Sequence, residues 1–290
     1  MADQQKRGAV LITGTSTGIG RTTALYLDKL GFEVFAAVRK ERDANMLSAE
    51  GSERLKPILL DVTDEATIAL ARDKVCRAVG DRGLAGLVNN AGIGFISPLE
   101  FVPLDELRGL FEVNLFGLLA VTQAFLPMLR KARGRIVNIS STSSIMVAPF
   151  HGPYSASKLG LNGLSDALRL ELRPLGVQVS VVVCGSVKTP IWEKGGGLAE
   201  RITKHYPPEA WELYGSRYKR LRDYFTRMGQ AGVPPETASR AIAHALTARR
   251  ARNTYLVGPD ARLFNIADKL LYGRLRDWVT LRVIGLSDRA

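Results

Sequence analysis

Short apolar runs alternate with longer amphipathic stretches along most of the chain. Seven runs predict β-strands because they are rich in Val, Ile or Leu and end in turn-forming residues. They span residues 7–14, 32–39, 55–64, 83–92, 134–141, 176–185 and 253–260. The stretches between most of them have helical periodicity, as at 19–31 and 64–79. This alternation predicts a single α/β domain over 1–290, a doubly wound parallel sheet of about seven strands with helices on both faces.

The apolar segments do not fit a targeting or membrane-spanning sequence. Residues 1–10 hold no apolar signal core, and no run reaches the ~18 uninterrupted apolar residues of a membrane span. The most apolar stretch, 110–129, is broken by three polar side chains and fits a buried amphipathic helix better. Cys76 and Cys184 have no metal-site or redox spacing, so we expect a reduced, cytoplasmic protein without a metal site.

The chain is basic, with a formal net charge of +12, and the charge is unevenly spread. Residues 201–290 contain 17 Lys/Arg and 8 Asp/Glu, whereas residues 1–200 contain 23 and 20. A basic C-terminal third attracts anions such as a phosphorylated ligand, a membrane surface or nucleic acid. A solvated arginine-rich surface is the simpler interpretation, and no helix-turn-helix, zinc-finger or RNA-binding motif accompanies the charge. We therefore expect no nucleic-acid partner.

A glycine-rich turn, TGTSTGIG at 13–20, follows the first predicted strand and leads directly into a helix. Gly14 permits the tight turn, Gly18 lets the backbone approach a pyrophosphate, and Gly20 lets the helix pack closely on the strand. The free N–H groups and dipole at the helix start bind the anion. The spacing is G-x-x-x-G-x-G rather than G-x-G-x-x-G, and glycines at such a turn can also serve only its shape. The position after the first strand favours dinucleotide binding.

The second predicted strand ends in Val38 and Arg39 rather than in a carboxylate. NAD sites usually place Asp or Glu near this point for the ribose hydroxyls, whereas a guanidinium binds a 2′-phosphate bidentately. Thr17 adds a hydroxyl donor for the same phosphate. Arg39 would also suit a solvated surface, but its position favours NADP (NADPH) as the cofactor over NAD.

The segment YSASK at 154–158 places a phenol four residues before an ammonium. In a helix this spacing puts Tyr154 and Lys158 on one face. A neighbouring cation lowers the pKa of a phenol from its ordinary value of about 10. The pair is a candidate proton donor and acceptor, although the spacing alone also fits a solvated helix face.

Six motifs occur in order along the chain: TGTSTGIG, LDVTD at 60–64, NNAG at 89–92, VNLFG at 113–117, NISS at 138–141 and YSASK. Together they closely resemble the classical short-chain dehydrogenase/reductase family over roughly residues 8–190. The details look most like its hydroxysteroid and retinol dehydrogenase branches. The resemblance implies a Rossmann-like fold and an NAD(P)-dependent oxidoreductase acting on CH–OH donors.

The resemblance also implies a catalytic tetrad of Asn114, Ser141, Tyr154 and Lys158. Tyr154 would act as base toward an alcohol or acid toward a carbonyl, and Ser141 would donate to the substrate oxygen. Lys158 would lower the pKa of Tyr154 and bond the nicotinamide ribose, while Asn114 would fix a water that connects Lys158 to solvent. The small residues between Tyr154 and Lys158 would leave room for cofactor and substrate.

The cofactor-binding residues that the resemblance implies come from every strand end of the first two thirds of the chain. They are Gly14, Ser16, Thr17, Gly18, Ile19, Gly20, Arg39, Asp61, Val62, Asn89, Ala91, Gly92, Tyr154, Lys158, Val187 and Thr189. One position departs from the family pattern, since Cys184-Gly185 stands where the family usually has Pro-Gly. We expect this departure to affect the backbone shape of the loop under the nicotinamide more than the catalytic chemistry.

Residues 191–232 are expected to form a substrate lid, because seven of these 42 residues are aromatic. They are Trp192, Tyr206, Trp211, Tyr214, Tyr218, Tyr224 and Phe225, and we expect the opposite wall to include Met146, Val147, Phe150, Phe95 and Ile96. An aromatic lid suits a bulky apolar substrate such as a steroid, a retinoid or an aldehyde. Each aromatic residue could instead pack the lid onto the sheet. His151, three residues before Tyr154, is left without a role.

The C-terminal extension, 259–290, has an apolar stripe among arginines. It could dock on its own core, on a partner subunit or on a membrane surface, which we rank last. We expect a homodimer or homotetramer.

Two other functions compete with an NADP-dependent oxidoreductase. A catalytically silent NADP-binding regulator of the same fold is the main alternative, and the intact tetrad argues against it. An epimerase or dehydratase of the extended branch would have a larger C-terminal domain than this chain contains.

Overall fold

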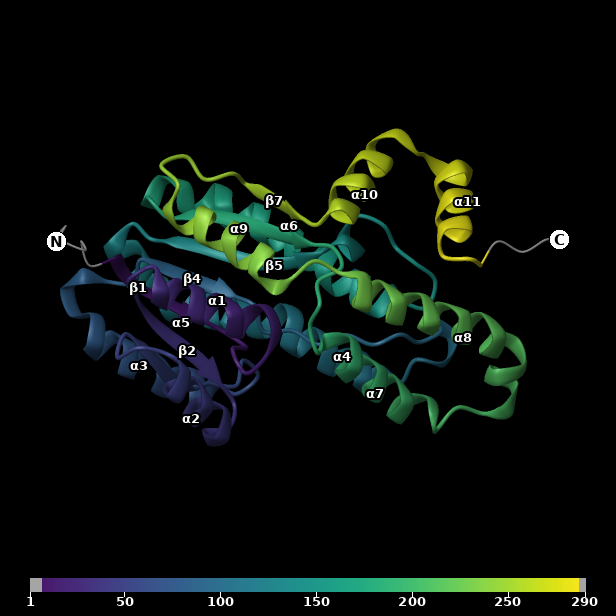
Figure 1. The fold of residues 1–290 in the computed structure, drawn as a ribbon, viewed down its shortest axis with the longest axis horizontal. Coiled ribbons are helices and arrows are strands. Elements are labelled where there is room, and N and C mark those ends of the chain that lie inside the picture. Colours follow the sequence, from purple (N-terminus) through teal and green to yellow (C-terminus); the bar gives the residue numbers. More distant parts are fainter. Residues whose placement is uncertain (1–6, 287–290) are drawn as a thin grey trace.

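The computed structural model describes residues 7–286, and in this range seven parallel strands form one sheet in the order β3-β2-β1-β4-β5-β6-β7 (Figure 1). The strands are β1 (Arg7–Ile12), β2 (Phe32–Val38), β3 (Leu55–Leu59), β4 (Gly86–Asn89), β5 (Arg135–Ser141), β6 (Gln178–Cys184) and β7 (Thr254–Val257). Each strand lies within a run predicted from its apolar pattern, so the predicted Rossmann-like sheet is confirmed.

Helices cover both faces of the sheet. They are α1 (Gly18–Lys29), α2 (Glu41–Glu50), α3 (Glu65–Val79), α4 (Leu104–Phe111), α5 (Gly117–Ala132), α6 (Gly152–Leu172), α7 (Ile191–Thr203), α8 (Pro208–Ala231), α9 (Pro235–Thr247), α10 (Pro259–Leu270) and α11 (Gly273–Val283). Successive side chains of a strand point to opposite faces. Thus Val10 and Ile12 pack with α1 and α9, whereas Ala9 and Leu11 pack with α3 and α5.

The strand order reverses at β1, which pairs with β2 on one side and β4 on the other. In a doubly wound sheet the connections diverge at such a point and leave a crevice beyond the carboxyl ends of the strands. The glycine-rich turn after β1 and the NNAG segment at the end of β4 therefore lie on the two sides of this crevice.

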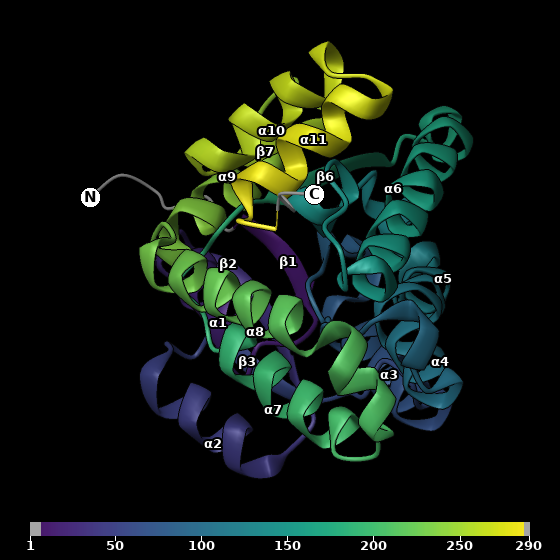
Figure 2. The ribbon, with the colours of Figure 1, turned by 90° about the vertical axis from the view of Figure 1, so that its right-hand side faces the viewer.

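The lid and the C-terminal extension pack together at this end of the molecule. Figure 2 shows α7 and α8 lying in front of the sheet, with α10 and α11 beside them. A third apolar cluster joins Phe95 to Leu221 of α8 and to Ile284 and Leu286 after α11. The end of the extension thus docks on the chain's own core, while Leu270, Tyr272 and Trp278 are exposed. Residues 287–290 of the predicted extension lie outside the described range.

The most apolar helical stretch, Leu104–Ala132, is long and apolar enough to cross a membrane by length and composition. In the fold it is the amphipathic helix expected from its polar interruptions. Val121, Phe125 and Leu129 of α5 recur on one face and are buried in the core. A π-helical turn, Glu112–Phe116, separates α4 from α5.

Candidate active site

One cleft of about 1490 Å³ runs along the carboxyl ends of the strands and under the lid. Of the predicted site residues, it is lined by Gly14, Ser16, Thr17, Gly18, Ile19, Arg39, Asp61, Val62, Ala91, Gly92, Ser141, Tyr154, Lys158, Val187 and Thr189. Three predicted residues, Gly20, Asn89 and Asn114, lie beneath this surface within the described part of the chain. The fold thus brings both ends of the predicted site into one space.

The glycine-rich turn fits a bound phosphate group. Gly14 has φ +69°, and a Cβ there would lie 2.8 Å from the Ala91 Cα. A Cβ on Gly20 would lie 2.4 Å from the Gly14 carbonyl oxygen, so Gly20 lets α1 start against the turn. Thr17, the N-cap of α1, makes no capping bond with its side chain, and the first turn of α1 has no acidic residue. The backbone N–H groups of the first turn of α1 and the helix dipole therefore remain available for an anion.

In the NNAG segment, the cleft is lined by a different asparagine from the one that the sequence analysis assigned to the cofactor site. Asn89 is buried, and its Nδ2 donates to Thr122 Oγ1 (3.0 Å) and Asn138 Oδ1 (2.9 Å), so Asn89 supports the sheet beneath the cleft and does not line it. Asn90, which the sequence analysis missed, lines the cleft. Its Nδ2 donates to the carbonyls of Thr13 (2.9 Å) and Gly14 (3.0 Å) and ties the glycine-rich turn to β4.

Asn114 lies in the π-helical turn and is almost fully buried. Its Oδ1 accepts from the Ile93 N–H (2.9 Å), and its Nδ2 donates to the Ile93 carbonyl (2.9 Å) and to Ser157 Oγ (3.0 Å). Both amide protons are therefore in use, and one lone pair of Oδ1 remains for the predicted water. The side chain positions the β4 loop against α6.

Tyr154 and Lys158 both face the cleft from the first turns of α6, as their spacing predicted. Lys158 Nζ lies 5.7 Å from the Tyr154 ring centroid and donates to the Ile139 carbonyl (2.9 Å). Burial lowers the pKa of Lys158 to about 8.

The expected lowering of the Tyr154 pKa is wrong for the protein without cofactor. Burial raises the pKa of Tyr154 to about 12, although a hydrogen bond with Ser141 acts in the opposite direction. Loss of hydration thus outweighs the stabilisation of the phenolate by Ser141. The Lys158 ammonium also donates a buried hydrogen bond to the Ile139 carbonyl of β5.

Two of the small residues between Tyr154 and Lys158 pack in the protein interior. Ser155 and Ser157 are buried and do not line the cleft among the described residues. Ser157 Oγ donates to the Tyr154 carbonyl (2.8 Å) and accepts from Asn114. Ser155 and Ser157 face the protein interior and the exposed Ala156 does not line the cleft either, so the expectation that these small side chains leave room in the cleft is corrected.

Ser141, at the end of β5, connects to a histidine that the sequence analysis left without a role. Ser141 Oγ donates to Ser143 Oγ (3.3 Å), which lies 3.2 Å from His151 Nδ1. The His151 ring stacks on Tyr154, with centroids 5.0 Å apart, and contacts Phe225 at 4.8 Å. Burial lowers the pKa of His151 to about 4, so the imidazole is neutral near pH 7.

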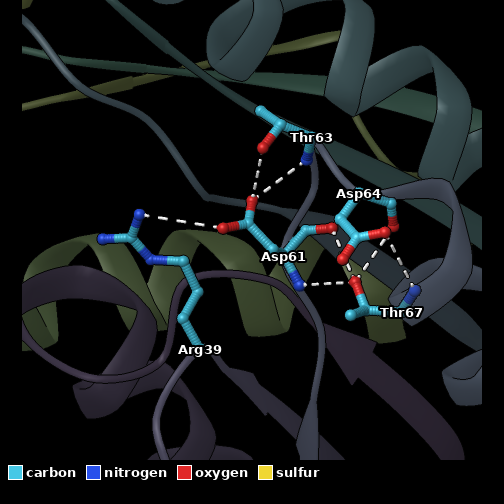
Figure 3. Close-up of polar contacts among 5 residues, drawn as sticks. All are labelled: Arg39, Asp61, Thr63, Asp64 and Thr67. Atoms are coloured by element: carbon cyan, nitrogen blue, oxygen red, sulfur yellow. Dashed lines mark hydrogen bonds and ion pairs between the residues drawn. The ribbon is translucent and has the colours of Figure 1, made fainter.

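Arg39 and Asp61 face each other at the ends of β2 and β3 (Figure 3). The guanidinium lies 3.9 Å from Asp61 Oδ2, and its side chain is 68% exposed. Asp61 Oδ1 accepts from the Thr63 N–H (3.0 Å) and hydroxyl (2.8 Å), so this carboxylate shapes its own turn. The guanidinium keeps most of its donors free for an anion.

The loop after β6 is held by the C-terminal extension. Asp260, at the start of α10, accepts from the Ser186 N–H (2.5 Å), and a Cβ on Gly185 would lie 2.0 Å from Asp260 Oδ1. Cys184, in the place of the family proline, is buried and lines the cleft. Glycine at 185 is thus required by the close approach of a carboxylate.

The aromatic residues of the lid form two groups. Trp192, Tyr224 and Phe225 line the cleft, together with the predicted Met146, Phe95 and Ile96. Tyr206, Trp211, Tyr214 and Tyr218 pack on one another or on Phe101 and Phe150 and do not line it among the described residues. Val147 and Phe150 are likewise not part of the wall. The wall of the cleft does include four residues of the C-terminal extension that sequence reasoning missed, namely Phe264, Thr280, Val283 and Ile284.

Comparison with known proteins agrees with this architecture. The family model described as short chain dehydrogenase matches residues 8–196. The chain is 38% identical over 283 residues to 17-beta-hydroxysteroid dehydrogenase type 6 of Bos taurus, covering 94% of this chain and 87% of that protein. It is 37% identical over 278 residues to retinol dehydrogenase 5 of Mus musculus, covering 93% and 86%.

The fold is also found in solved structures. A short-chain dehydrogenase from Streptomyces avermitilis superposes with a TM-score of 0.76 at 29% identity, covering 98% of both chains. The family match, the relatives and the fold confirm the resemblance inferred from the motifs. The chain therefore belongs to the short-chain dehydrogenase/reductase family, is most similar in kind to its hydroxysteroid and retinol dehydrogenases, and is an oxidoreductase acting on CH–OH donors.

Proposed function

We propose that this protein transfers a hydride between NADP and the alcohol or carbonyl carbon of an apolar substrate: a steroid, a retinoid, or an aliphatic or aromatic aldehyde or ketone. The observation that carries the proposal is the single cleft, in which a phosphate-binding turn, the Ser141–Tyr154–Lys158 group and an apolar lid face one another. When bound, the nicotinamide supplies the hydride chemistry and, in its oxidised form, a positive charge.

The proton is handled by Tyr154. With a pKa raised to about 12, the phenol is protonated in the free protein and is ready to donate to a carbonyl oxygen. Toward an alcohol it must first ionise, and the Lys158 ammonium in the same cleft favours that step. Ser141 holds the substrate oxygen beside the phenol by donating a hydrogen bond. Asn114 acts indirectly, by fixing the β4 loop and α6 around the pair.

The preference for NADP rests on the charge at the ends of β2 and β3. Arg39, Lys40 and Arg42 line the cleft there, against the carboxylates of Asp43 and Asp61. The Arg39 guanidinium is mostly exposed and paired with Asp61 only at 3.9 Å, so it can turn to a 2′-phosphate. A bidentate guanidinium–phosphate contact is both strong and specific.

The substrate class rests on the lid. Trp192 and Phe225 stack with centroids 6.2 Å apart and line the cleft on the side of Tyr154 and His151. Ile284, after α11, closes the same compartment. A relative named for hydroxysteroids and one named for retinol support an apolar substrate with rings or a long chain.

A catalytically silent NADP-binding regulator is the alternative function. It is less well supported because Ser141, Tyr154 and Lys158 line the same cleft, and both amide protons of Asn114 are hydrogen-bonded beneath them. Oxidation of NADPH with any member of a panel of apolar ketones and aldehydes, followed by absorbance, excludes this alternative.

We further propose a cytoplasmic homodimer or homotetramer without a nucleic-acid partner, with membrane-surface contact ranked last. Support comes from large apolar side chains that are exposed on neighbouring helices, such as Leu104 of α4, Phe116 of the π turn and Leu159 of α6. Sedimentation velocity should give two or four times the 31.7 kDa of the chain. A single species at the mass of one chain would refute the oligomer.

Tyr154→Phe should lower kcat by ~10²–10⁴-fold, since it removes the titrating hydroxyl and keeps the ring. The Kd for NADP⁺, measured by fluorescence titration, should change little. Tyr272→Phe, at an exposed tyrosine outside the cleft, is the matched control and should behave as wild type. Activity of Tyr154→Phe within about tenfold of wild type would remove the phenol from the mechanism.

The ionisation of Tyr154 should be shifted upward in the free protein and downward by NADP⁺. Burial raises the pKa to about 12, so the protonated phenol should persist from pH 6 to 10. A bound positive charge favours the phenolate and lowers this pKa. Ultraviolet titration of wild type against Tyr154→Phe isolates this one tyrosine. An extra ionisation in the free wild type with a midpoint below its ordinary pKa would contradict the burial effect.

Wild type should have a higher kcat/KM with NADPH than with NADH, and Arg39→Asp should reverse the order. Loss of a charge-assisted bond costs ~1.5–3 kcal/mol, which corresponds to roughly 10–100-fold for NADPH. Arg72→Asp, on the exposed face of α3, changes the net charge equally and should leave the preference intact. Equal or better kcat/KM with NADH in wild type would show that the assignment of Arg39 is wrong.

Trp192→Ala and Phe225→Ala should raise KM for bulky apolar substrates much more than for small ones. Contact area lost at ~25 cal/mol per Å² amounts to several kcal/mol only for a substrate that fills the compartment. Trp211→Ala, a lid tryptophan outside the cleft lining, is the control. Faster turnover of small sugars or hydroxy acids than of every steroid, retinoid and aliphatic aldehyde tested would refute the apolar compartment.

A further inference from the structure

A lysine of the lid reaches across the cleft to the glycine-rich turn. Lys194, in the first turns of α7, donates from Nζ to the Thr17 hydroxyl at 2.9 Å. The two residues are 177 positions apart in sequence, and both line the cleft. The lid and the start of α1 are therefore in direct polar contact at the place where the cofactor's phosphates are expected.

The chain holds α7 in this position by close packing. The Trp192 indole N–H donates to the Val187 carbonyl (2.8 Å), and a Cβ on Gly229 of α8 would lie 2.7 Å from the Trp192 ring. A Cβ on Gly195 would lie 2.8 Å from the Gly94 carbonyl oxygen in the loop after β4. Thus α7 contacts the β1–α1 turn through Lys194 and the opposite wall of the crevice through Gly195.

Lys194 brings a positive charge to the start of α1. Lys194 makes no ion pair with any residue that the structure describes, and it points its ammonium at the N-terminus of α1, whose first turn has no acidic residue. The partial positive charge of a helix N-terminus repels a cation and attracts an anion. Arg39 and Lys188 line the same cleft, as do the carboxylates of Asp43, Asp61 and Glu193. Lys194 and the start of α1 therefore meet at a point of the cleft where a phosphate would lower the electrostatic energy.

We infer that Lys194 is a cofactor-binding residue carried by the lid, whose ammonium contacts a phosphate group of the dinucleotide beside Thr17 and so couples cofactor binding to closure of α7 over the substrate compartment. The inference rests on the proposed use of a nicotinamide dinucleotide. The phosphate is the 2′-phosphate or the pyrophosphate, and only NADP carries the former. Thr17 was assigned to the 2′-phosphate from the sequence, and its hydrogen bond with Lys194 favours that group.

Binding measured without turnover tests the contact. Fluorescence titration gives Kd for NADP⁺ and NAD⁺ with wild type, Lys194→Met, Lys194→Arg and Lys204→Met, which removes an exposed lysine at the other end of α7. Lys194→Met should weaken NADP⁺ at least tenfold, while Lys194→Arg and Lys204→Met stay near wild type. If Lys194→Met weakens NADP⁺ but leaves the Kd for NAD⁺ unchanged, the contact is with the 2′-phosphate. If it weakens NADP⁺ and NAD⁺ binding equally, the contact is with the pyrophosphate. Lys194→Met with both Kd values within twofold of wild type overturns the inference.

Lid closure is a second and separate readout. Chymotrypsin cleaves after aromatic residues, and Trp211 on α8 is exposed. Saturating NADP⁺ should protect α7 and α8 from cleavage in wild type and Lys194→Arg, and much less in Lys194→Met. Equal protection in all three would overturn the coupling. Equal Kd values of the wild type for NAD⁺ and NADP⁺ would refute only the proposed preference for NADP. The Lys194 contact would still be tested by the weaker NAD⁺ binding expected of Lys194→Met.

Discussion

The site depends on one buried amide. Asn114 bonds both backbone groups of Ile93 and the hydroxyl of Ser157, and so it joins the π turn, the loop after β4 and helix α6. A buried N–H or carbonyl without a partner costs ~1–3 kcal/mol, so removing this amide would penalise all three segments at once. Tyr154 and Lys158 are on α6, and Gly92 lies directly over Asn114 and the Lys158 ammonium. The geometry of the reacting groups therefore follows from a residue that does not itself face the cleft.

The sheet and the shape of the glycine-rich turn could be predicted because their causes are local. The runs around β1, β5 and β6 are apolar on both faces, and such patterns fit only a strand covered on both sides. Gly14 is required by the tight turn and Gly20 by the close approach of the start of α1 to that turn, and both lie in one short segment. Their roles were visible without any knowledge of the rest of the fold.

The features that the sequence did not predict depend on distant parts of the chain. The pKa of Tyr154 has the opposite sign from the expectation because burial by the lid and by α6 is a tertiary property. The predicted Asn89 supports the sheet and the unpredicted Asn90 lines the cleft, because successive side chains at the end of β4 point in opposite directions. The walls supplied by Phe264 and Ile284, and the contact of Lys194 with Thr17, join segments that no local pattern relates.

Burial gives the free protein a definite electrostatic state. The Tyr154 phenol is held protonated, the pKa of Lys158 is lowered, and the imidazole of His151 is neutral, so the catalytic end of the cleft opposes new charge. The other end of the cleft has the opposite character where the Lys194 ammonium lies against the N-terminus of α1. Under the proposed function, a nicotinamide dinucleotide with its phosphates at the start of α1 would place its ring near Tyr154, where a positive charge on that ring would favour the phenolate. The same burial that keeps Tyr154 inactive as a base in the free protein makes its ionisation responsive to what occupies the cleft.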